Sequence, residues 1–225
     1  IGNGGSAIMT VNNGGDVTVG WETKLGDEIG STGTPTIDGA GSTLTSAIAA
    51  TTVGNSGQGP LTVSHGGLLP TDGIKIADYF LRHVLVEHGS VIDTIGTGVG
   101  NRAAGTLTLA NEGTIQSPLV SVVTIGTLGG SGTIAGSVAN EGFTNPGNGA
   151  GILTVTGDFT QLLGTLNIEL GGAAVGTEYD QLAAGGIVTL GGTLNVSLIN
   201  GYNPTDGEFV IVQGGTIVGA FVAEN

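Results

Sequence analysis

The sequence has no cysteine and only four basic residues among its 225. The absence of cysteine excludes a small fold held by disulfides and any thiolate metal site. The basic residues are Lys24, Lys75, Arg82 and Arg102, and 18 acidic residues bring the formal net charge to −14. Binding to nucleic acid requires many cations opposite the phosphates, so a nucleic-acid partner is excluded, and attachment to an anionic membrane surface is disfavoured.

The chain is also poor in aromatic residues (4%) and in proline (6 residues). No apolar run is long enough to span a bilayer, so we expect no membrane insertion by this segment, and no signal peptide is visible. The first residue, Ile1, lies inside a repeat. We therefore expect the chain to be part of a longer protein.

Glycine, in contrast, is abundant, with 46 residues. Because 39% of the residues are hydrophobic and only 10% are charged, the chain is apolar enough to bury a core and is not expected to be disordered. Glycine adopts positive φ at tight turns without steric cost. Its spread between short runs of Val, Ile, Leu and Thr predicts many turns between many short strands.

Internal repeats organise the chain. The segment IGNGGSAIMTVNNGG (1–15) returns as VGNSGQGPLTVSHGG (53–67), and a related half-unit at 29–39 divides this long period into two coils. Val63, Val86 and Leu109 then follow one another at equal, shorter intervals. The tetrapeptide ANEG at Ala110 recurs at Ala139, which we take as a further repeat.

Apolar and small polar residues alternate within each run, as in LTVT at Leu153 and LNVSL at Leu194. This alternation places the apolar side chains on one face, which stacked coils can bury together. The sequence thus predicts an all-β fold, a parallel β-helix (β-solenoid) of roughly eight to ten coils over residues 1–225. We expect the following side chains to share one core: Leu61, Val63, Leu107, Leu109, Leu153, Val155, Leu166, Ile168, Leu194 and Val196.

Several of these motifs resemble a known family. VGNSGQGPLTVSHGG and GAGSTLTS (39–46) resemble repeats of autotransporter passengers and of exported bacterial surface proteins. PGNGAGILTVTGDFTQ (146–161), GTLNIELGG (164–172), GTEYDQL (176–182) and GGTLNVSLINGYNPTDGEF (191–209) are similar to the membrane-proximal end of a passenger. The resemblance divides the solenoid into repeat-bearing coils (1–115) and passenger C-terminal-like coils (116–225). It implies a right-handed helix, a location outside the cell or on the bacterial surface, a scaffold role and no catalytic residues.

Two segments fit the repeat less well. Residues 68–85 depart from it, which leaves room for a local loop with its own role. Residues 77–89 could also form a helix with Ala77, Leu81 and Leu85 on one face. The repeat register that relates Val86 to Val63 favours a strand there.

A few residue patterns could carry chemistry. His65 and His88 are aligned by the repeat, which suggests two stacked imidazoles at a turn or, with further ligands, a metal site. Asn111-Glu112 and Asn140-Glu141 could align as a hydrogen-bonded asparagine ladder or as an acid–base carboxylate pair.

Other candidates are weaker. Glu178, Asp180, Asp206 and Glu208 are isolated by spacing, and the calcium-roll pattern does not occur. We assign no catalytic, cofactor-binding or metal-binding residues and expect no cofactor.

Three hypotheses about function remain. The first is a secreted or cell-surface structural or adhesive scaffold without catalytic activity, whose ligand would be a host or matrix surface. A self-assembling extracellular filament subunit, associating end to end or with neighbouring passenger segments, is a special form of it. The alternative is a carbohydrate-active enzyme on a β-helix.

Overall fold

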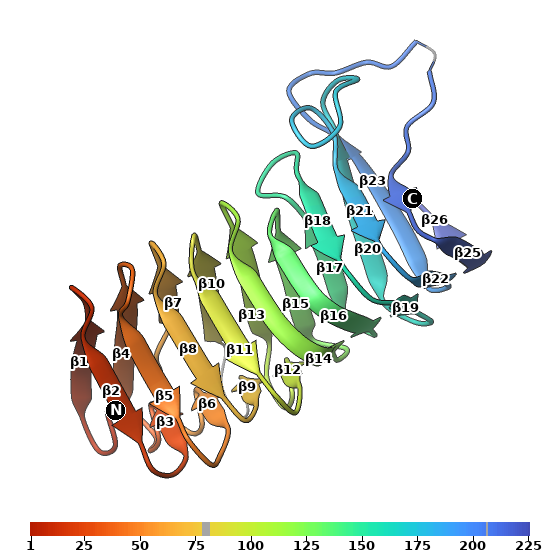
Figure 1. Ribbon diagram of the computed structural model, residues 1–225. Helices are drawn as coiled ribbons and strands as arrows, with labels where there is room; N and C mark the ends of the chain where they lie inside the picture. The colour runs from red at the N-terminus through yellow and green to blue at the C-terminus, as the bar shows by residue number, and fades with distance from the viewer. Residues whose placement is uncertain (78–81, 206) are drawn as a thin grey trace.

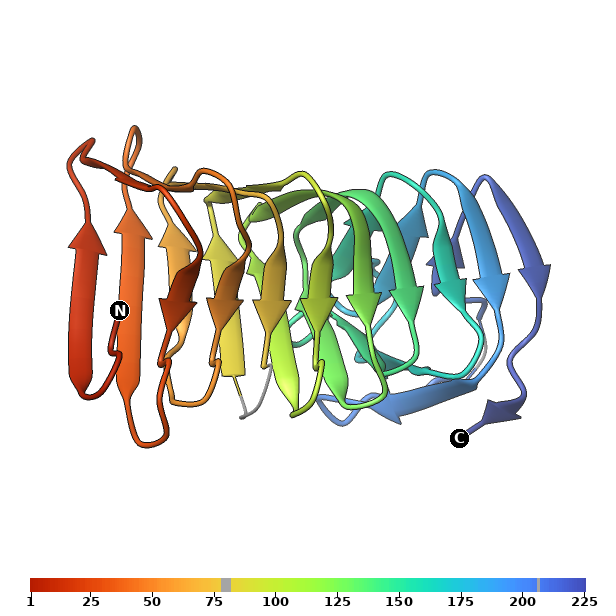
Figure 2. The same cartoon turned by 90° about the horizontal axis from the view of Figure 1, so that it is seen from below.

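The computed structural model describes residues 1–77, 82–205 and 207–225, and they form a parallel β-helix (Figures 1 and 2). Each coil contributes one strand to a first sheet and one or two strands to a second, so that strands of successive coils lie side by side along the rod. The paired strands are parallel throughout both sheets, as expected when the chain winds in one sense. The described residues include no α-helix, and so no helix that could cross a membrane.

The first sheet has ten strands and runs the whole length of the rod. Its strands are, in spatial order, β1 (Ser6–Val11), β4 (Thr32–Asp38), β7 (Leu61–Ser64), β10 (Arg82–Glu87), β13 (Gly105–Ala110), β15 (Gly126–Gly130), β17 (Phe143–Pro146), β20 (Thr165–Leu170), β23 (Thr193–Leu198) and β26 (Ala223–Glu224).

The second sheet has 16 strands and folds around a corner, so it supplies the other two faces of the coil. One face contains β2 (Asp16–Val19), β5 (Thr43–Ser46), β8 (Leu68–Thr71), β11 (Ser90–Asp93), β18 (Ile152–Val155), β21 (Gln181–Ala184) and β24 (Val212–Gln213). The other contains β3 (Thr23–Leu25), β6 (Thr51–Val53), β9 (Ile74–Ile76), β12 (Thr97–Val99), β19 (Phe159–Gln161), β22 (Ile187–Leu190) and β25 (Thr216–Gly219). Two long strands, β14 (Thr114–Val122) and β16 (Thr133–Asn140), belong to both faces.

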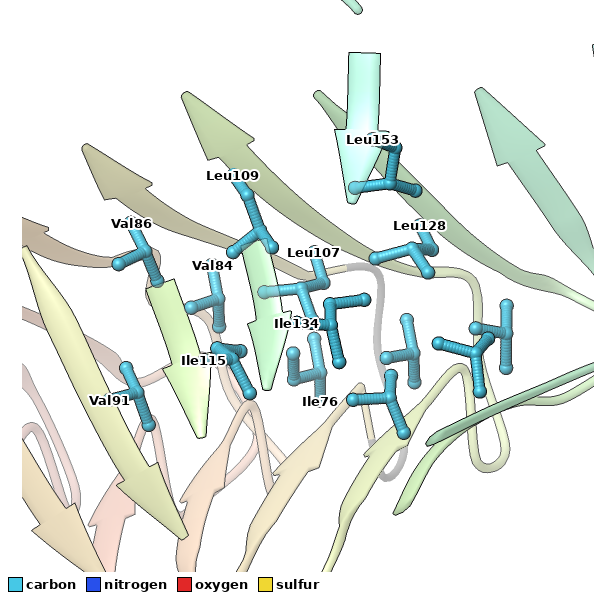
Figure 3. Close-up of a cluster of buried hydrophobic side chains, with 14 of the residues drawn as sticks. Ile76, Val84, Val86, Val91, Leu107, Leu109, Ile115, Leu128, Ile134 and Leu153 are labelled. Carbon is cyan, nitrogen blue, oxygen red and sulfur yellow. The ribbon is translucent and has the colours of Figure 1, made fainter. Parts of the chain in front are cut away.

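One continuous hydrophobic core fills the interior. Figure 3 shows side chains from both sheets meeting there, among them Leu107 and Leu109 of β13 opposite Ile115 of β14. Nine of the ten core residues predicted from the sequence are at most 9% exposed, and the tenth, Val196, is partly buried and packs against the core. The period-two prediction is confirmed.

The predicted register is confirmed as well. Ile37 lies beside Val11 on one side and beside Val63 on the other, so the long sequence period that relates Val11 to Val63 is two coils. Val86 lies between Val63 and Leu109, as their equal spacing in the sequence predicts.

The expectation for residues 68–85 was wrong over the part described. Residues 68–71 and 74–76 form β8 and β9, which pair with neighbouring coils like other strands. The segment 82–87 is strand β10, so the helical alternative is wrong there. Residues 78–81, which both expectations include, lie outside the described residues.

The proposed repeat ANEG was also wrong. Ala110 ends β13 in the first sheet, whereas Ala139 lies in β16 of the second sheet, beside Ser121. The physical reason is coil length. Leu109 already pairs with Gly130, so the longer interval between the two ANEG segments passes one whole coil and reaches the next corner.

Candidate functional site

The turns that follow the first-sheet strands carry a column of polar side chains. Asn13, His65, His88 and Asn111 occupy equivalent turn positions with φ between 45° and 53°. Asparagine tolerates this left-handed conformation better than most residues, and histidine is also enriched there. The alignment places the rings of His65 and His88 parallel, with centroids 6.1 Å apart, which confirms the predicted stack.

The neighbours of His65 determine what this column can do. Its Nδ1 lies 2.7 Å from Oδ1 of Asp38, and the Ser64 hydroxyl donates to the same oxygen at 2.7 Å. The hydrogen bond to Asp38 raises the pKa of His65, while the bonds from Ser64 and then His65 lower the pKa of Asp38. Because Ser64 bonds to the carboxylate and not to the imidazole, these three side chains lack the hydroxyl-to-histidine hydrogen bond of a Ser–His–Asp triad.

The geometry does not support a metal site in this column. No group of three or more His, Cys, Asp or Glu side chains among the described residues could hold an ion. Asn111 donates to Glu87 at 2.5 Å, so this coil-to-coil contact continues the column as a hydrogen-bonded pair.

The pairing proposed for the two Asn-Glu motifs was wrong. Glu112 follows β13, where the chain leaves the first sheet, whereas Glu141 follows β16, where it leaves the second. The two carboxylates therefore lie at different corners and cannot act as an acid–base pair. Buried Asn140 donates to Gln161 of the next coil at 2.8 Å, so a ladder forms there with a different partner.

His83 lies off the line of His65 and His88, as expected from its position in the repeat. Its Nε2 is 2.9 Å from the Thr108 hydroxyl of the next coil, and burial lowers its pKa. A hollow of about 300 Å³ adjoins it, lined also by Gln58, Pro60 and Thr106.

A polar hollow lies on the outside of the first sheet, where β17, β20 and β23 are side by side. It has a volume of about 380 Å³. We call it the asparagine pocket; its lining consists of Asn145, Pro146, Gly147, Asn148, Gly149, Asn167, Glu169, Asp180, Asn195 and Ser197. Figure 1 shows loops leaving the stack at the ends of these three strands, on the same edge of the sheet.

An amide ladder forms the floor of this pocket. Asn167 donates to Asn145 at 2.6 Å, and Asn195 donates to Asn167 at 2.9 Å. The three residues belong to successive coils, and Asn167 and Asn195 are register partners. The ladder ties the coils together and fixes the orientation of the three amides.

Two carboxylates lie at the edge of the same pocket. Glu169 is on β20, and the chain returns through a loop to Asp180, which is only 1% exposed. The Asp180 oxygens accept the backbone N–H groups of Gly151 and Glu169, both at 2.8 Å. Burial raises the pKa of Asp180 to about 6, although the two N–H bonds oppose the shift and the charge of Glu169 adds to it.

Asp180 was expected from its spacing to be isolated, but the structure brings it beside Glu169, which lies 11 residues earlier in the chain. Of the others in that group, Glu178 accepts the N–H groups of Ala173 and Ala174 within its own loop, and Asp206 lies outside the described residues. A signal for the amide ladder was present, since Asn167 and Asn195 occupy the same place in GTLNIEL and GTLNVSL.

Asp180 provides a test of these electrostatics. Its folded-state pKa of about 6 exceeds the ordinary value of 3.8, so its stabilising contribution is complete below pH 3.8 and is lost as the pH rises through 6. We expect this group to lower the free energy of unfolding by up to about 3 kcal/mol between pH 4 and pH 7.5. Urea unfolding of the parent and of Asp180→Asn at both pH values should show a weaker pH dependence in the variant.

The control for this experiment is Glu141→Gln, which removes an exposed carboxylate. Its pH dependence should match that of the parent. An equal pH dependence in the parent and in Asp180→Asn would contradict the raised pKa.

Comparison with models of protein families, with curated proteins and with solved structures gave no match for this chain.

Proposed function

We propose that the chain is a non-catalytic scaffold segment of a bacterial surface protein of the autotransporter-passenger type, displayed outside the cell. The observation that supports this most is the use of polar side chains as links between coils. The His65–Asp38, Asn111–Glu87 and Asn140–Gln161 contacts each join one coil to the next. Such links, over a continuous core, favour a stiff rod that can hold its surface away from the cell.

The net charge of −14 fits the same role. Self-repulsion keeps an extended, glycine-rich rod from clumping laterally. The sequence motifs quoted above supply the link to exported surface proteins.

One observation favours the alternative, a carbohydrate-active enzyme. Glu169 and Asp180 line a single polar pocket, and paired carboxylates are the usual catalytic groups of glycoside hydrolysis. Against it, Asp180 accepts two backbone N–H groups and is almost fully buried, so its carboxyl is committed to holding the loop against β20. We therefore favour the scaffold.

The test is a turnover assay with the whole chain. Neutral and acidic polysaccharides and a casein substrate are incubated with the protein, and reducing ends, unsaturated products and peptides are measured. We expect no activity above that of a heat-inactivated sample. Product formation that Glu169→Gln abolishes would contradict the scaffold proposal and support the enzyme.

We also propose that the terminal coils pair with further coils, either of neighbouring passenger segments or of another copy. Within the described residues, the outermost strands pair with a neighbouring strand on one side only, so backbone N–H and C=O groups on the other side have no strand partner. Core-facing apolar side chains are incompletely covered at both ends, with Met9 only partly buried on β1 and Ile217 47% exposed on β25. Strand addition at these edges would satisfy the backbone and cover the apolar groups.

Sedimentation velocity and electron microscopy over a concentration series test this pairing. We expect rods that lengthen end to end as the concentration rises. Particles that stay monomeric at every concentration, or that associate side by side, would contradict end-to-end pairing of the chain with itself.

A further inference from the structure

We propose that the asparagine pocket binds a neutral, hydroxyl-rich ligand, namely a short stretch of a glycan chain. This inference rests on the proposed scaffold function, because it gives the surface rod a specific adhesive contact. The ligand class follows from the hydrogen-bonding groups, the charge and the spacing of the pocket.

The hydrogen-bonding groups are of both kinds. A side-chain amide has two N–H donors and two carbonyl lone pairs. Within the ladder, Asn167 uses one N–H toward Asn145 and one lone pair toward Asn195. One donor and one acceptor therefore remain on Asn167, held in a fixed orientation. A sugar hydroxyl both donates and accepts, so it matches such an amide better than a purely anionic or cationic group does.

The charge of the pocket excludes anionic ligands, and its lining disfavours apolar ligands and a bound metal. Among the described residues that line it, none is basic and both Glu169 and Asp180 are acidic, so phosphate, sulfate and uronate groups would be repelled. Pro146 is the one side chain of the lining that offers mainly apolar surface, which disfavours a lipid or an aromatic ligand. A bound metal is disfavoured because no cluster of three potential ligands occurs in the described part of the chain.

The spacing of the ladder suits a polymer. Asn145, Asn167 and Asn195 belong to three successive coils, so the amides recur about every 4.8 Å across the sheet. This repeat is of the same order as the length of one sugar unit. The volume of about 380 Å³ is that of a small ligand pocket, and the Gly147–Gly149 turn and Asp180 form one side of it.

Side-chain amide NMR tests the proposal directly. Cellohexaose, maltohexaose and mannohexaose are titrated separately into the isotopically labelled chain, and the NH₂ signals of the asparagines are followed. With at least one of the three, we expect saturable shifts of the signals of Asn145, Asn167 and Asn195. Shifts caused by calcium chloride at these residues, with none caused by the sugars, would overturn the proposal.

Two matched variants locate the binding. Ser197→Phe adds a ring at an exposed position in the pocket lining, whereas Thr62→Phe adds the same ring to the outer face of β7, far along the same sheet. We expect Ser197→Phe to weaken binding at least about tenfold through lost hydrogen bonds and blocked space, and Thr62→Phe to leave it unchanged. Equal affinity in both variants would overturn the proposed site.

The same samples separate this inference from the function on which it rests. The sugars are recovered after titration and analysed for chain length. No binding by any of the three hexasaccharides would overturn the glycan site and leave the scaffold proposal in place. Binding accompanied by shortened sugars would support the site while contradicting a scaffold without catalytic activity.

Discussion

Replacing Asp93 with alanine is expected to lower the free energy of unfolding by about 3 kcal/mol or more, because three donors lose their acceptor and a fourth, the Ser117 hydroxyl, keeps only the Leu119 carbonyl at 3.1 Å. Asp93 is 2% exposed at the corner between β11 and β12. Its Oδ1 accepts the N–H groups of Ile95 at 2.9 Å and Gly96 at 2.7 Å. Its Oδ2 accepts the hydroxyls of Thr97 at 2.7 Å and Ser117 at 2.9 Å.

The bond from Ser117 makes this corner a link between coils, since Ser117 lies on β14 of the next coil. Water cannot easily replace the lost carboxylate at a site this deeply buried. The measurement is guanidinium unfolding followed by circular dichroism. If the dependence of the free energy of unfolding on guanidinium concentration has the same slope in the parent and the variant, the two unfold to the same extent.

Asp72→Ala is the control for Asp93. It occupies the equivalent corner of the preceding coil but accepts a single bond, from the Thr94 hydroxyl at 3.2 Å, in an exposed setting. We expect a loss within about 1 kcal/mol there. Similar losses in both variants would show that the buried acceptor is not what stabilises the corner.

Gly130→Ala is expected to destabilise the protein by about 3–5 kcal/mol. Gly130 has a φ of 98° and ends β15, directly beside Leu109. A Cβ there would lie 1.9 Å from the carbonyl oxygen of Leu109, which is backbone and cannot rotate away. The coils would have to separate, which would weaken the hydrogen bonds between them.

Gly30→Ala is the control that separates the steric clash at position 130 from the cost of placing alanine in the left-handed conformation. Gly30 has a similar φ of 81°, but nothing lies within 4 Å of its Cβ position. Alanine at this position pays only for the left-handed conformation, so we expect the free energy of unfolding to fall by about 1–2 kcal/mol. Denaturant unfolding of the two variants side by side gives the comparison, and equal losses would contradict a steric limit on coil spacing.

Several features of the fold could be predicted because they repeat. Val63, Val86 and Leu109 recur at one interval, which gives the length of a coil. Each is also an apolar residue in a strand where apolar and polar residues alternate, which shows that its side chain faces the core. Coil length is not constant, however. The register partners Asn167 and Asn195 are farther apart in the sequence than the register partners Leu109 and Gly130. Two copies of a motif can therefore lie at different corners of the coil even when their separation is close to a coil length. For this reason the prediction that the two ANEG segments occupy equivalent positions in the repeat was wrong.

Less of the candidate site could be predicted, because it is made by contacts that no local pattern encodes. The stack of His65 and His88 was predictable, since both residues follow strands in register. Asp180 was not, because a loop between β20 and β21 brings it back to the N–H of Glu169. The sequence also could not predict that the Ser64 hydroxyl bonds to Asp38 and not to the His65 ring, because this depends on side-chain geometry.

The regular step from one coil to the next is the property on which the fold and both proposals depend. Outward positions Thr10, Thr36, Thr62, Leu85, Thr108, Gly129 and Asn145 are successive register partners in the first sheet. Because the chain has no native cysteine, spin labels can be attached to introduced cysteines alone.

Double electron–electron resonance on two doubly labelled variants measures this step. Thr10→Cys with Thr108→Cys spans four steps, and Thr10→Cys with Asn145→Cys spans six. At about 4.8 Å per step, we predict backbone separations of about 19 Å and about 29 Å, and label distances that differ accordingly. A six-step distance equal to or shorter than the four-step distance would mean that the sheet closes on itself, and would contradict the stacked solenoid.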